Sequence, residues 1–294
     1  MELQLVNLTK EFGNFRAVNN LNLTISNGVY GLLGVNGAGK TTLMKMICSL
    51  LTPTSGKILC DGQDIGGMGG EYRNLLGYLP QEFGFYPEFT VKDYLLYIAA
   101  LKGIRPIVAK KKVNKLLAQV GLSKAANKKM RKLSGGMKRR AGIAQAILND
   151  PKILILDEPT AVLSDKEVEI LFKMIDKLKE QKTTIVYISH KLDEVFRVSD
   201  RIAVMRDGQL ITVLENKALE KEDLIKHMLG RKIGMMFPEK SSKLDGETIL
   251  EVSDLSTEKV HHISFELKKG EILGIAGLVG SGRTELARAL YGMA

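Results

Sequence analysis

Apolar positions along the chain follow two periods, one typical of buried strands and one typical of amphipathic helices. Ile153–Leu156 is an unbroken apolar run, as expected of a central parallel strand that is covered on both faces. Thr183–Ser189 is a second strand, rich in β-branched residues. After Pro106, four apolar residues recur at the i, i+3, i+4 and i+7 positions of a helix: Val113, Leu116, Leu117 and Val120. The pattern predicts an α/β fold with a mostly parallel sheet.

Other stretches add detail around this sheet. Leu3–Val6 and Leu21–Ile25 are short strands, expected in an N-terminal antiparallel part. Residues from about 91 to 149 are expected to form a helical subdomain. Gly66–Gly70 is predicted to be a flexible connector, because no strand feeds it. Ser164–Glu167 has the sequence of a capping box and predicts the start of a further helix.

The beginning of the chain is repeated near its end. Residues 260–267 echo residues 18–25, and Gly277–Thr284 echoes the glycine-rich stretch Gly34–Thr41. The repeat indicates two related domains, of which the second is represented only by its first part.

We therefore expect a complete domain over residues 1–230 and a linker over 231–246. Residues 247–294 are expected to be the truncated start of a second domain. A piece of about 50 residues rarely buries a sufficient core by itself. This last segment is accordingly expected to be poorly ordered or loosely packed.

Composition and length favour a soluble chain. Hydrophobic residues make up 45% of the 294 positions and charged residues 26%, an ordinary globular balance. No apolar run approaches the roughly 18 residues of a membrane helix, and the N-terminus lacks the regions of a signal peptide. Cys48 and Cys60 fit no metal spacing. We interpret them as reduced, small hydrophobic residues of a cytoplasmic protein.

The net charge of +10 is concentrated in one region, because no acidic residue occurs between Tyr94 and Asn149. The cations of that region are Lys102, Arg105, Lys110, Lys111, Lys112, Lys115, Lys124, Lys128, Lys129, Arg131, Lys132, Lys138, Arg139 and Arg140. They form either a solvated helical face or a surface close to anionic lipid headgroups or a membrane partner. Specific nucleic-acid binding is disfavoured, because no aromatic residues are interleaved with the charge to stack bases.

A phosphate-binding loop follows the predicted strand Tyr30–Leu33. Its glycines let backbone N–H groups approach an anion closely, and the helix that follows presents its positive end. The lysine can bridge the β- and γ-phosphates of a nucleotide, and the threonine hydroxyl can hold Mg²⁺. The predicted nucleotide-binding residues are Gly34, Asn36, Gly37, Ala38, Gly39, Lys40, Thr41 and Thr42.

Two carboxylates end the apolar strand Ile153–Leu156. Asp157 can reach the Mg²⁺ shell, and Glu158 is the candidate general base for an attacking water. A surface carboxylate pair at a strand end is the alternative. Together with the phosphate-binding loop, the pair predicts a P-loop nucleoside triphosphatase that uses Mg²⁺.

The stretch Leu133–Met137 narrows this prediction. Ser134 can cap a helix, Gly135 and Gly136 allow close approach, and the helix dipole favours an anion. The order of these motifs resembles the ATP-binding cassette of an ABC transporter. In that family the helix start points at the γ-phosphate bound by the opposite cassette of a dimer. The resemblance thus implies a P-loop fold of ABC type and assigns all three residues to nucleotide binding.

Three further positions follow the family pattern. Phe12 lies where an aromatic residue that stacks on adenine is expected, with core packing as the alternative. Gln81 resembles the residue that senses the metal in a loop facing the membrane subunit. His190, after the predicted strand, resembles the switch histidine that contacts the γ-phosphate. Glu158, His190 and Gln81 are therefore the predicted catalytic residues, and Thr41, Gln81 and Asp157 the predicted metal ligands.

The two halves of the chain resemble different branches of the family. Residues up to about Thr160 are similar to exporter-type cassettes. From Ala161 onward the chain is similar to the tandem cassettes of sugar importers of the ribose or galactose type, which suggests a recombined or joined chain. Ser164 stands where many cassettes have an aspartate, and Arg283 replaces the loop lysine in the second repeat. Arg keeps the charge but not the compact ammonium geometry.

The resemblance implies an ATPase that drives a membrane transporter, with permease subunits and a second cassette as partners. It places the chain on the inner face of the cell membrane. Sugar import rests on the second half. The alternatives are a non-hydrolysing truncated or regulatory fragment, an exporter-type cassette, or a soluble ABC protein acting on ribosomes or DNA. The last would need two complete cassettes or a long inserted coiled coil.

Overall fold

Two β-sheets build the first of the two units into which the chain divides, Met1–Gly234 and Met235–Ala294. The computed structural model describes residues 1–230, 246–277 and 280–293. The linker predicted over 231–246 falls almost entirely outside the described residues, so that prediction stays open.

The larger sheet has the strand order β10-β9-β3-β8-β7-β6, and its central strands are parallel. Its strands, in chain order, are β3 Gly28–Leu33, β6 Leu76–Leu79, β7 Ile153–Asp157, β8 Thr184–Ile188, β9 Arg201–Arg206 and β10 Gln209–Glu215. The order of β3, β7 and β8 means that they are joined by crossovers rather than by hairpins. Their carboxyl ends therefore meet at one edge of the sheet.

Strand β7 is buried on both faces, as its unbroken apolar run predicts. Leu154 and Leu156 belong to the core shared with the helices on one face. Ile153 and Ile155 belong to the core shared with the antiparallel sheet and α1 on the other. Strand β8 alternates between the same two cores. The predicted α/β fold with a parallel central sheet is confirmed.

The smaller sheet is antiparallel, with the order β2-β1-β4-β5. Its strands are β1 Leu3–Phe12, β2 Phe15–Ile25, β4 Ser55–Cys60 and β5 Gln63–Asp64. Strands β1 and β2 are longer than predicted, because each continues through an irregularity. Asn7 and Asn20 both adopt φ of 47° there, a left-handed conformation that asparagine tolerates. These bulges interrupt the alternation that marks a strand in sequence.

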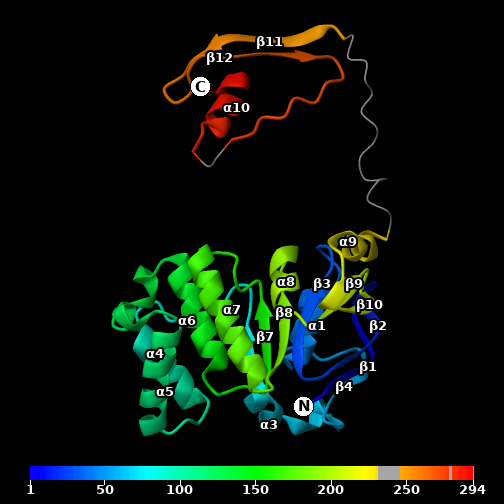
Figure 1. Cartoon of the computed structure of the whole chain (residues 1–294), viewed down its shortest axis with the longest axis vertical. Helices are drawn as coiled ribbons and strands as arrows, with labels where there is room; N and C mark the ends of the chain where they lie inside the picture. The colour runs from blue at the N-terminus through cyan, green and yellow to red at the C-terminus, as the bar shows by residue number, and fades with distance from the viewer. Residues whose placement is uncertain (231–245, 278–279, 294) are drawn as a thin grey trace. The chain divides into compact units, whose positions relative to one another are not determined.

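Three helices pack into a bundle at the edge of the unit opposite the antiparallel strands (Figure 1). They are α4 Val91–Leu101, α5 Pro106–Gln119 and α6 Gly135–Ile147. Thr90 caps α4 by accepting a hydrogen bond from the Asp93 N–H, 3.1 Å long. Single 3₁₀ turns at Ser123–Ala125 and Met130–Lys132 connect α5 to α6.

The remaining helices of this unit cover the sheet or its edges. They are α1 Lys40–Ile47, α2 Ile65–Met68, α3 Gly70–Leu75, α7 Asp165–Glu180, α8 Leu192–Val198 and α9 Lys221–Leu229, with a 3₁₀ turn at Asn216–Ala218. The capping box predicted at Ser164–Glu167 is present. The prediction of a flexible connector over Gly66–Gly70 was wrong, because these residues belong largely to α2 and the start of α3. Asp64 caps α2, and Tyr72 of α3 is fully buried, which fixes this segment.

Both cysteines are buried and free, as predicted. Burial raises the pKa of the Cys48 thiol to about 12, so it behaves as a small hydrophobic residue. None of the described helices is long and apolar enough to cross a membrane.

The second unit contains the hairpin β11 Thr248–Leu255 and β12 Ile263–Lys268, and the helix α10 Arg283–Leu290. Among its described residues, the buried hydrophobic side chains are Val252, Val260 and Leu286. This core is small, and Ile272 is 97% exposed. Loose packing stays a prediction, which hydrogen exchange across the unit can test.

Candidate functional site

An open cavity of about 970 Å³ lies at the carboxyl ends of β3, β7 and β8. Segments far apart in sequence meet there. The predicted site residues that line it are Gly34, Asn36, Gly37, Ala38, Gly39, Lys40, Thr41, Thr42, Gln81, Asp157, Glu158 and His190. Phe12 and the three residues at the start of α6 do not line it.

Close backbone approach explains two glycines of the phosphate-binding loop. A Cβ atom on Gly34 would lie 2.3 Å from the carbonyl oxygen of Met205. Gly39 has φ of +95°, and a Cβ there would lie 2.2 Å from the carbonyl oxygen of Ala17. Any side chain at either position would push the loop away from the strands behind it. Helix α1 begins directly after Gly39, so its free N–H groups face the loop.

The Lys40 ammonium is held at the wall of the cavity by the loop itself. Its Nζ donates hydrogen bonds of 2.7 Å to the carbonyl oxygen of Gly34 and 3.1 Å to that of Val35. Burial lowers the pKa of Lys40, although the nearby carboxylates of Glu158 and Asp157 act in the opposite direction. A positive group is thus placed beside the backbone amides that would receive phosphate oxygens.

Asp157 and Glu158 stand side by side at the end of β7 but in different environments. Asp157 is 6% exposed. Burial, and then the charge of Glu158, raise its pKa above the ordinary value. Glu158 has φ of 48°, a strained conformation, and its N–H donates to the Ile188 carbonyl oxygen over 2.9 Å. This bond turns the Glu158 side chain toward the end of β8.

His190 is the partner of Glu158. Its Nδ1 lies 2.8 Å from Glu158 Oε2, and the two side chains are 71% and 15% exposed. The residues are 32 positions apart and meet only because β7 and β8 are adjacent parallel strands. A carboxylate next to an imidazole at the mouth of a cavity can accept a proton from a water held there.

The side chains predicted to hold Mg²⁺ line one cavity and offer a carboxylate, a hydroxyl and an amide oxygen. They come from Asp157, Thr41 and Gln81. Among the described residues, no group of three His, Cys, Asp or Glu side chains could hold a metal. The three oxygen donors suit Mg²⁺, which prefers oxygen ligands and shares its coordination with substrate phosphates and water.

Arg139 of α6 is a site residue that sequence reasoning missed. It is 4% exposed. Its Nη1 donates to the carbonyl oxygens of Pro80, at 2.6 Å, and Gln81, at 2.9 Å. Its Nε donates to the Pro159 carbonyl oxygen at 3.3 Å, and its Nη2 to that of Asp157. One guanidinium thus fastens the Pro80–Gln81 loop to both sides of the carboxylate pair.

A sequence signal for this role exists. Arg139 lies one helical turn before Ile143 and two before Ala146, and both are buried. A cation in the core-facing row of a helix needs buried partners. Here those partners are carbonyl groups at the ends of strands.

Glu194 is a second residue that was missed. Its carboxylate accepts hydrogen bonds from Thr160 Oγ1 at 2.6 Å, Tyr187 OH at 2.9 Å and Ser189 Oγ at 3.1 Å. Burial pushes the pKa of Glu194 upward, but the bonds from Thr160, Lys191 and Tyr187 outweigh it, so that the pKa is lowered. The charged carboxylate ties the segment after Glu158 to the strand end that carries His190.

The aromatic residue nearest the cavity is Phe15. Phe12 and Phe15 face each other across the β1–β2 turn. Phe15 lines the cavity, whereas Phe12 lies under the Lys10 ammonium, 5.3 Å from its ring centroid. The prediction of Phe12 as the adenine contact therefore stays open. Phe15 is an alternative, because it has the same aromatic ring and lines the cavity.

The start of α6 lies away from the cavity. Ser134 caps the helix, as predicted, since its Oγ accepts the Met137 N–H at 3.3 Å. A Cβ on Gly135 would lie 3.7 Å from Val162, and one on Gly136 would lie 3.1 Å from Glu167 Oε2. These three residues therefore do not line the cavity that contains Lys40.

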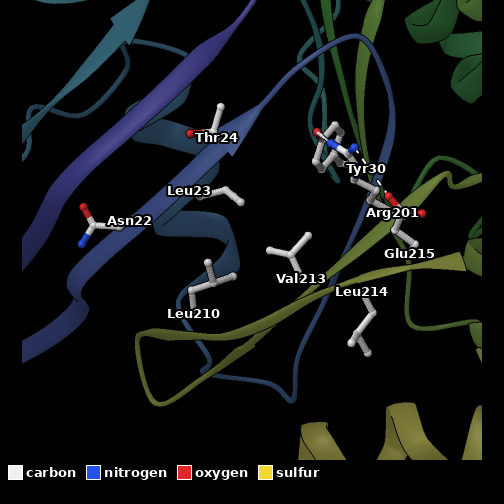
Figure 2. Close-up of a pocket in the computed structure, with 9 residues that line it drawn as sticks. All are labelled: Asn22, Leu23, Thr24, Tyr30, Arg201, Leu210, Val213, Leu214 and Glu215. Carbon is white, nitrogen blue, oxygen red and sulfur yellow. Dashed lines mark hydrogen bonds and ion pairs between the residues drawn. The ribbon is translucent and has the colours of Figure 1, made fainter.

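A second cavity, of about 320 Å³, lies between β2 and the β9–β10 hairpin. Figure 2 shows Leu23, Leu210 and Val213 between these strands, with Arg201 beside Tyr30. Arg201 donates to the Tyr30 hydroxyl at 2.8 Å and lies 3.7 Å from Glu215. Its charge is already paired, and neither the glycine loop nor the carboxylate pair reaches it. This cavity is not the candidate site.

Comparison with known proteins agrees with this geometry. The family model described as "ABC transporter" matches residues 18–161. The dimeric structure of a bacterial ABC transporter cassette superposes with a TM-score of 0.68 at 27% identity, covering 74% of this chain and all of that one. The first unit belongs to the ABC family of ATP-binding cassettes. Cassettes of this family are ATPases.

The curated relatives extend the similarity beyond this cassette. The ribose import ATP-binding protein of Rubrobacter xylanophilus is 39% identical over 99% of the chain. The galactose/methyl galactoside import ATP-binding protein of Haemophilus influenzae is 38% identical over 99%. The chain spans 60% of the length of the first and 59% of the second. Both alignments run across Asp157–Ala161, where the two halves were expected to diverge.

Replacing Arg139 by Lys is expected to destabilise the cassette by about 2–3 kcal/mol, because one ammonium cannot reach all four carbonyl oxygens. Chemical denaturation followed by circular dichroism measures this loss. The exposed Arg105→Lys is the matched control, expected to change stability by less than about 0.5 kcal/mol. Equal stability of both variants would show that the buried hydrogen bonds of Arg139 contribute nothing.

Asp157→Asn is expected to stabilise the nucleotide-free cassette by about 0.5–2 kcal/mol at neutral pH, because it removes a buried negative charge beside Glu158. The sign follows from the raised pKa of Asp157. The protonated carboxyl favours the fold below its unfolded pKa near 3.8, and that contribution is lost as pH rises through the folded pKa. Thermal unfolding across pH measures the effect. The exposed Asp176→Asn should leave the profile unchanged, and a destabilised Asp157→Asn would refute the account.

Proposed function

We propose that the chain binds Mg-ATP and hydrolyses it as the energy-coupling subunit of an ABC transporter. One observation carries this proposal. A single cavity brings together the phosphate-binding loop, the metal-binding side chains and the Glu158–His190 pair. Each of these features performs one part of nucleoside triphosphate hydrolysis.

The roles follow from position. The loop amides and Lys40 hold the β- and γ-phosphates, with Thr42 on the cavity wall beside them. Thr41, Gln81 and Asp157 would hold Mg²⁺, which would neutralise charge on the phosphate oxygens.

Glu158 takes the proton of the attacking water. His190, 2.8 Å away, orients that carboxylate and lines the cavity where it would contact the γ-phosphate. The phosphate–oxygen bond to the leaving ADP breaks as the bond to the water oxygen forms, and the proton on Glu158 is later released to solvent.

The position of Ser134, Gly135 and Gly136 supports a dimeric active form. Their helix start is exposed and lies outside the cavity of its own chain. Its free N–H groups suit the γ-phosphate of a nucleotide held by a second cassette. The similar bacterial cassette was solved as a dimer.

Sugar import is the transport function that we propose. The ribose and galactose import proteins align with nearly the whole chain, on both sides of Ala161. Permease subunits would be the membrane partners, which would hold the cassette at the inner face of the membrane.

The domain assignment belongs to the same proposal. Residues 1–230 act as a complete cassette, 231–246 as a linker, and 247–294 as the start of a second cassette. Arg283 replaces the lysine of the phosphate-binding loop in that repeat. The residues that we assign to hydrolysis all belong to the first cassette.

Glu158→Gln is expected to lower ATP turnover about 10²- to 10⁴-fold, because the amide cannot accept the proton of the attacking water. ATP affinity, measured by calorimetry, should be retained. The exposed Glu169→Gln on α7 is the matched control and should keep full turnover. Wild-type turnover in Glu158→Gln would exclude it as the base.

The same assay, run across protein concentration, tests the dimer. Turnover should rise faster than linearly. Gly135→Asp should abolish this rise while leaving ATP affinity intact, because it places a carboxylate where phosphate oxygens are expected. Gly135→Ala adds only a methyl group in ordinary contact with Val162 and is the control. Linear turnover with unchanged Gly135→Asp would argue for a monomeric enzyme.

Cells that depend on this chain for transport should lose uptake of labelled ribose or galactose when its gene is deleted. Wild-type chain should restore uptake, and Glu158→Gln should not, because it cannot complete the hydrolysis cycle. Unchanged uptake of both sugars would contradict sugar import and leave the ATPase proposal standing.

A further inference from the structure

The acid-free region between Tyr94 and Asn149 has no role in the proposed hydrolysis, apart from Arg139 and the start of α6. Two groups of its cations differ in their ionic partners, and neither group includes Lys102, Lys124, Lys128, Lys132 or Lys138. The first group has ionic partners outside the region. Lys112 pairs with Asp150, Lys129 and Arg131 pair with Glu88, and Arg140 pairs with Glu167 at 2.9 Å.

The second group surrounds the α4–α5 turn and the outer side of α5. Within the described parts of the chain these cations form no ion pair, and exposed apolar side chains lie among them. We call this the α5 surface, made of Leu101, Arg105, Ile107, Val108, Lys110, Lys111 and Lys115.

Helix geometry explains why these residues share one side. The inner row of α5 packs into the core through Ala109, Val113, Leu116 and Leu117. Ile107, Lys111 and Lys115 follow one another at intervals of four, so they form an outer row. In Figure 1, α4 and α5 lie at the rim of the first unit, far from its antiparallel strands.

The apolar members of the surface are unusually exposed for their type. Ile107 is 76% exposed and Leu101 67%. Along the chain they alternate with Arg105 and Lys110. Single apolar side chains among cations match the composition of peripheral membrane anchors.

We propose that the α5 surface binds the anionic headgroups of a lipid bilayer, with Ile107 and Leu101 reaching the acyl boundary. Charge complementarity carries the argument. Arg105, Lys110, Lys111 and Lys115 are exposed on the α5 surface and form no ion pair with any residue that the structure describes. Each cation near an anionic bilayer contributes about 1 kcal/mol, which is about a fivefold factor in affinity.

The residue types argue for lipid rather than a protein partner. Protein interfaces are depleted in lysine and enriched in arginine and aromatic residues, whereas three of these four cations are lysines. The nearest aromatic rings, of Tyr86, Phe89 and Tyr97, pack against one another within 5.6 Å between centroids. No ring on this surface can stack a nucleic-acid base.

The test is sedimentation of the purified full-length chain with vesicles of phosphatidylcholine alone or mixed with phosphatidylglycerol. Binding should require phosphatidylglycerol and weaken with salt. The triple reversal Lys110→Glu, Lys111→Glu and Lys115→Glu should lower affinity by more than about a hundredfold, at about fivefold per charge removed. Ile107→Ser, added to the triple reversal, should weaken vesicle binding further at any salt concentration, because it removes an apolar contact.

The matched control reverses three exposed lysines on α7, namely Lys166, Lys173 and Lys177. It carries the same net charge and should bind anionic vesicles within about threefold of the wild type. Equal loss in both triple variants would overturn the proposal, since net charge would then explain binding. Binding to phosphatidylcholine alone, or none to either vesicle, would overturn it as well.

The inference does not rest on the proposed function, and the two can fail separately. ATP turnover in solution should be the same for the α5 variant and the wild type, because the α5 surface lies outside the nucleotide cavity. A copurifying acidic protein that binds wild-type chain but not the α5 variant, without vesicle binding, would assign the surface to a protein partner instead.

Discussion

Burial of the central parallel strands on both faces is the constraint on which the rest of the structure depends. Strand β7 can be apolar from Ile153 to Leu156 because helices cover one face and the antiparallel sheet covers the other. Charged side chains of these central strands can then lie only where the strands end and the core stops. Asp157, Glu158 and His190 therefore appear at one edge, beside the glycine loop that ends β3. The site is a consequence of where the core stops.

That edge is also where unfavourable charge collects. Burial, and then the adjacent carboxylate of Glu158, raise the pKa of Asp157. The carboxylate pair therefore needs compensating positive charge. Lys40 and the buried Arg139 supply it from different segments. Arg139 donates its hydrogen bonds to backbone carbonyl oxygens rather than to carboxylates. Arg139 thus positions the backbone and leaves both carboxylates open to the cavity. The two adjacent carboxylates lower the stability of the fold, as is common at functional sites.

The molecule presents two outward surfaces that its own fold does not use. The start of α6 offers free N–H groups away from the local cavity, and the α5 surface offers unpaired cations at the rim of the bundle. Both belong to the helical bundle, and both have a chemistry that suits an anion. We propose a nucleotide held by a second chain as the partner of the first surface, and an anionic bilayer as the partner of the second.

The sequence by itself determined the α/β fold, the phosphate-binding loop, the carboxylate pair and the helix caps, because each depends on residues close together in the chain. The tertiary structure alone decided the long-range meetings. Arg139 donates to carbonyl oxygens at the ends of β6 and β7. Glu194 joins the segments around Thr160 and Ser189. Phe15 lines the cavity, whereas Phe12 does not. Such contacts depend on strand order and register, which no local pattern encodes.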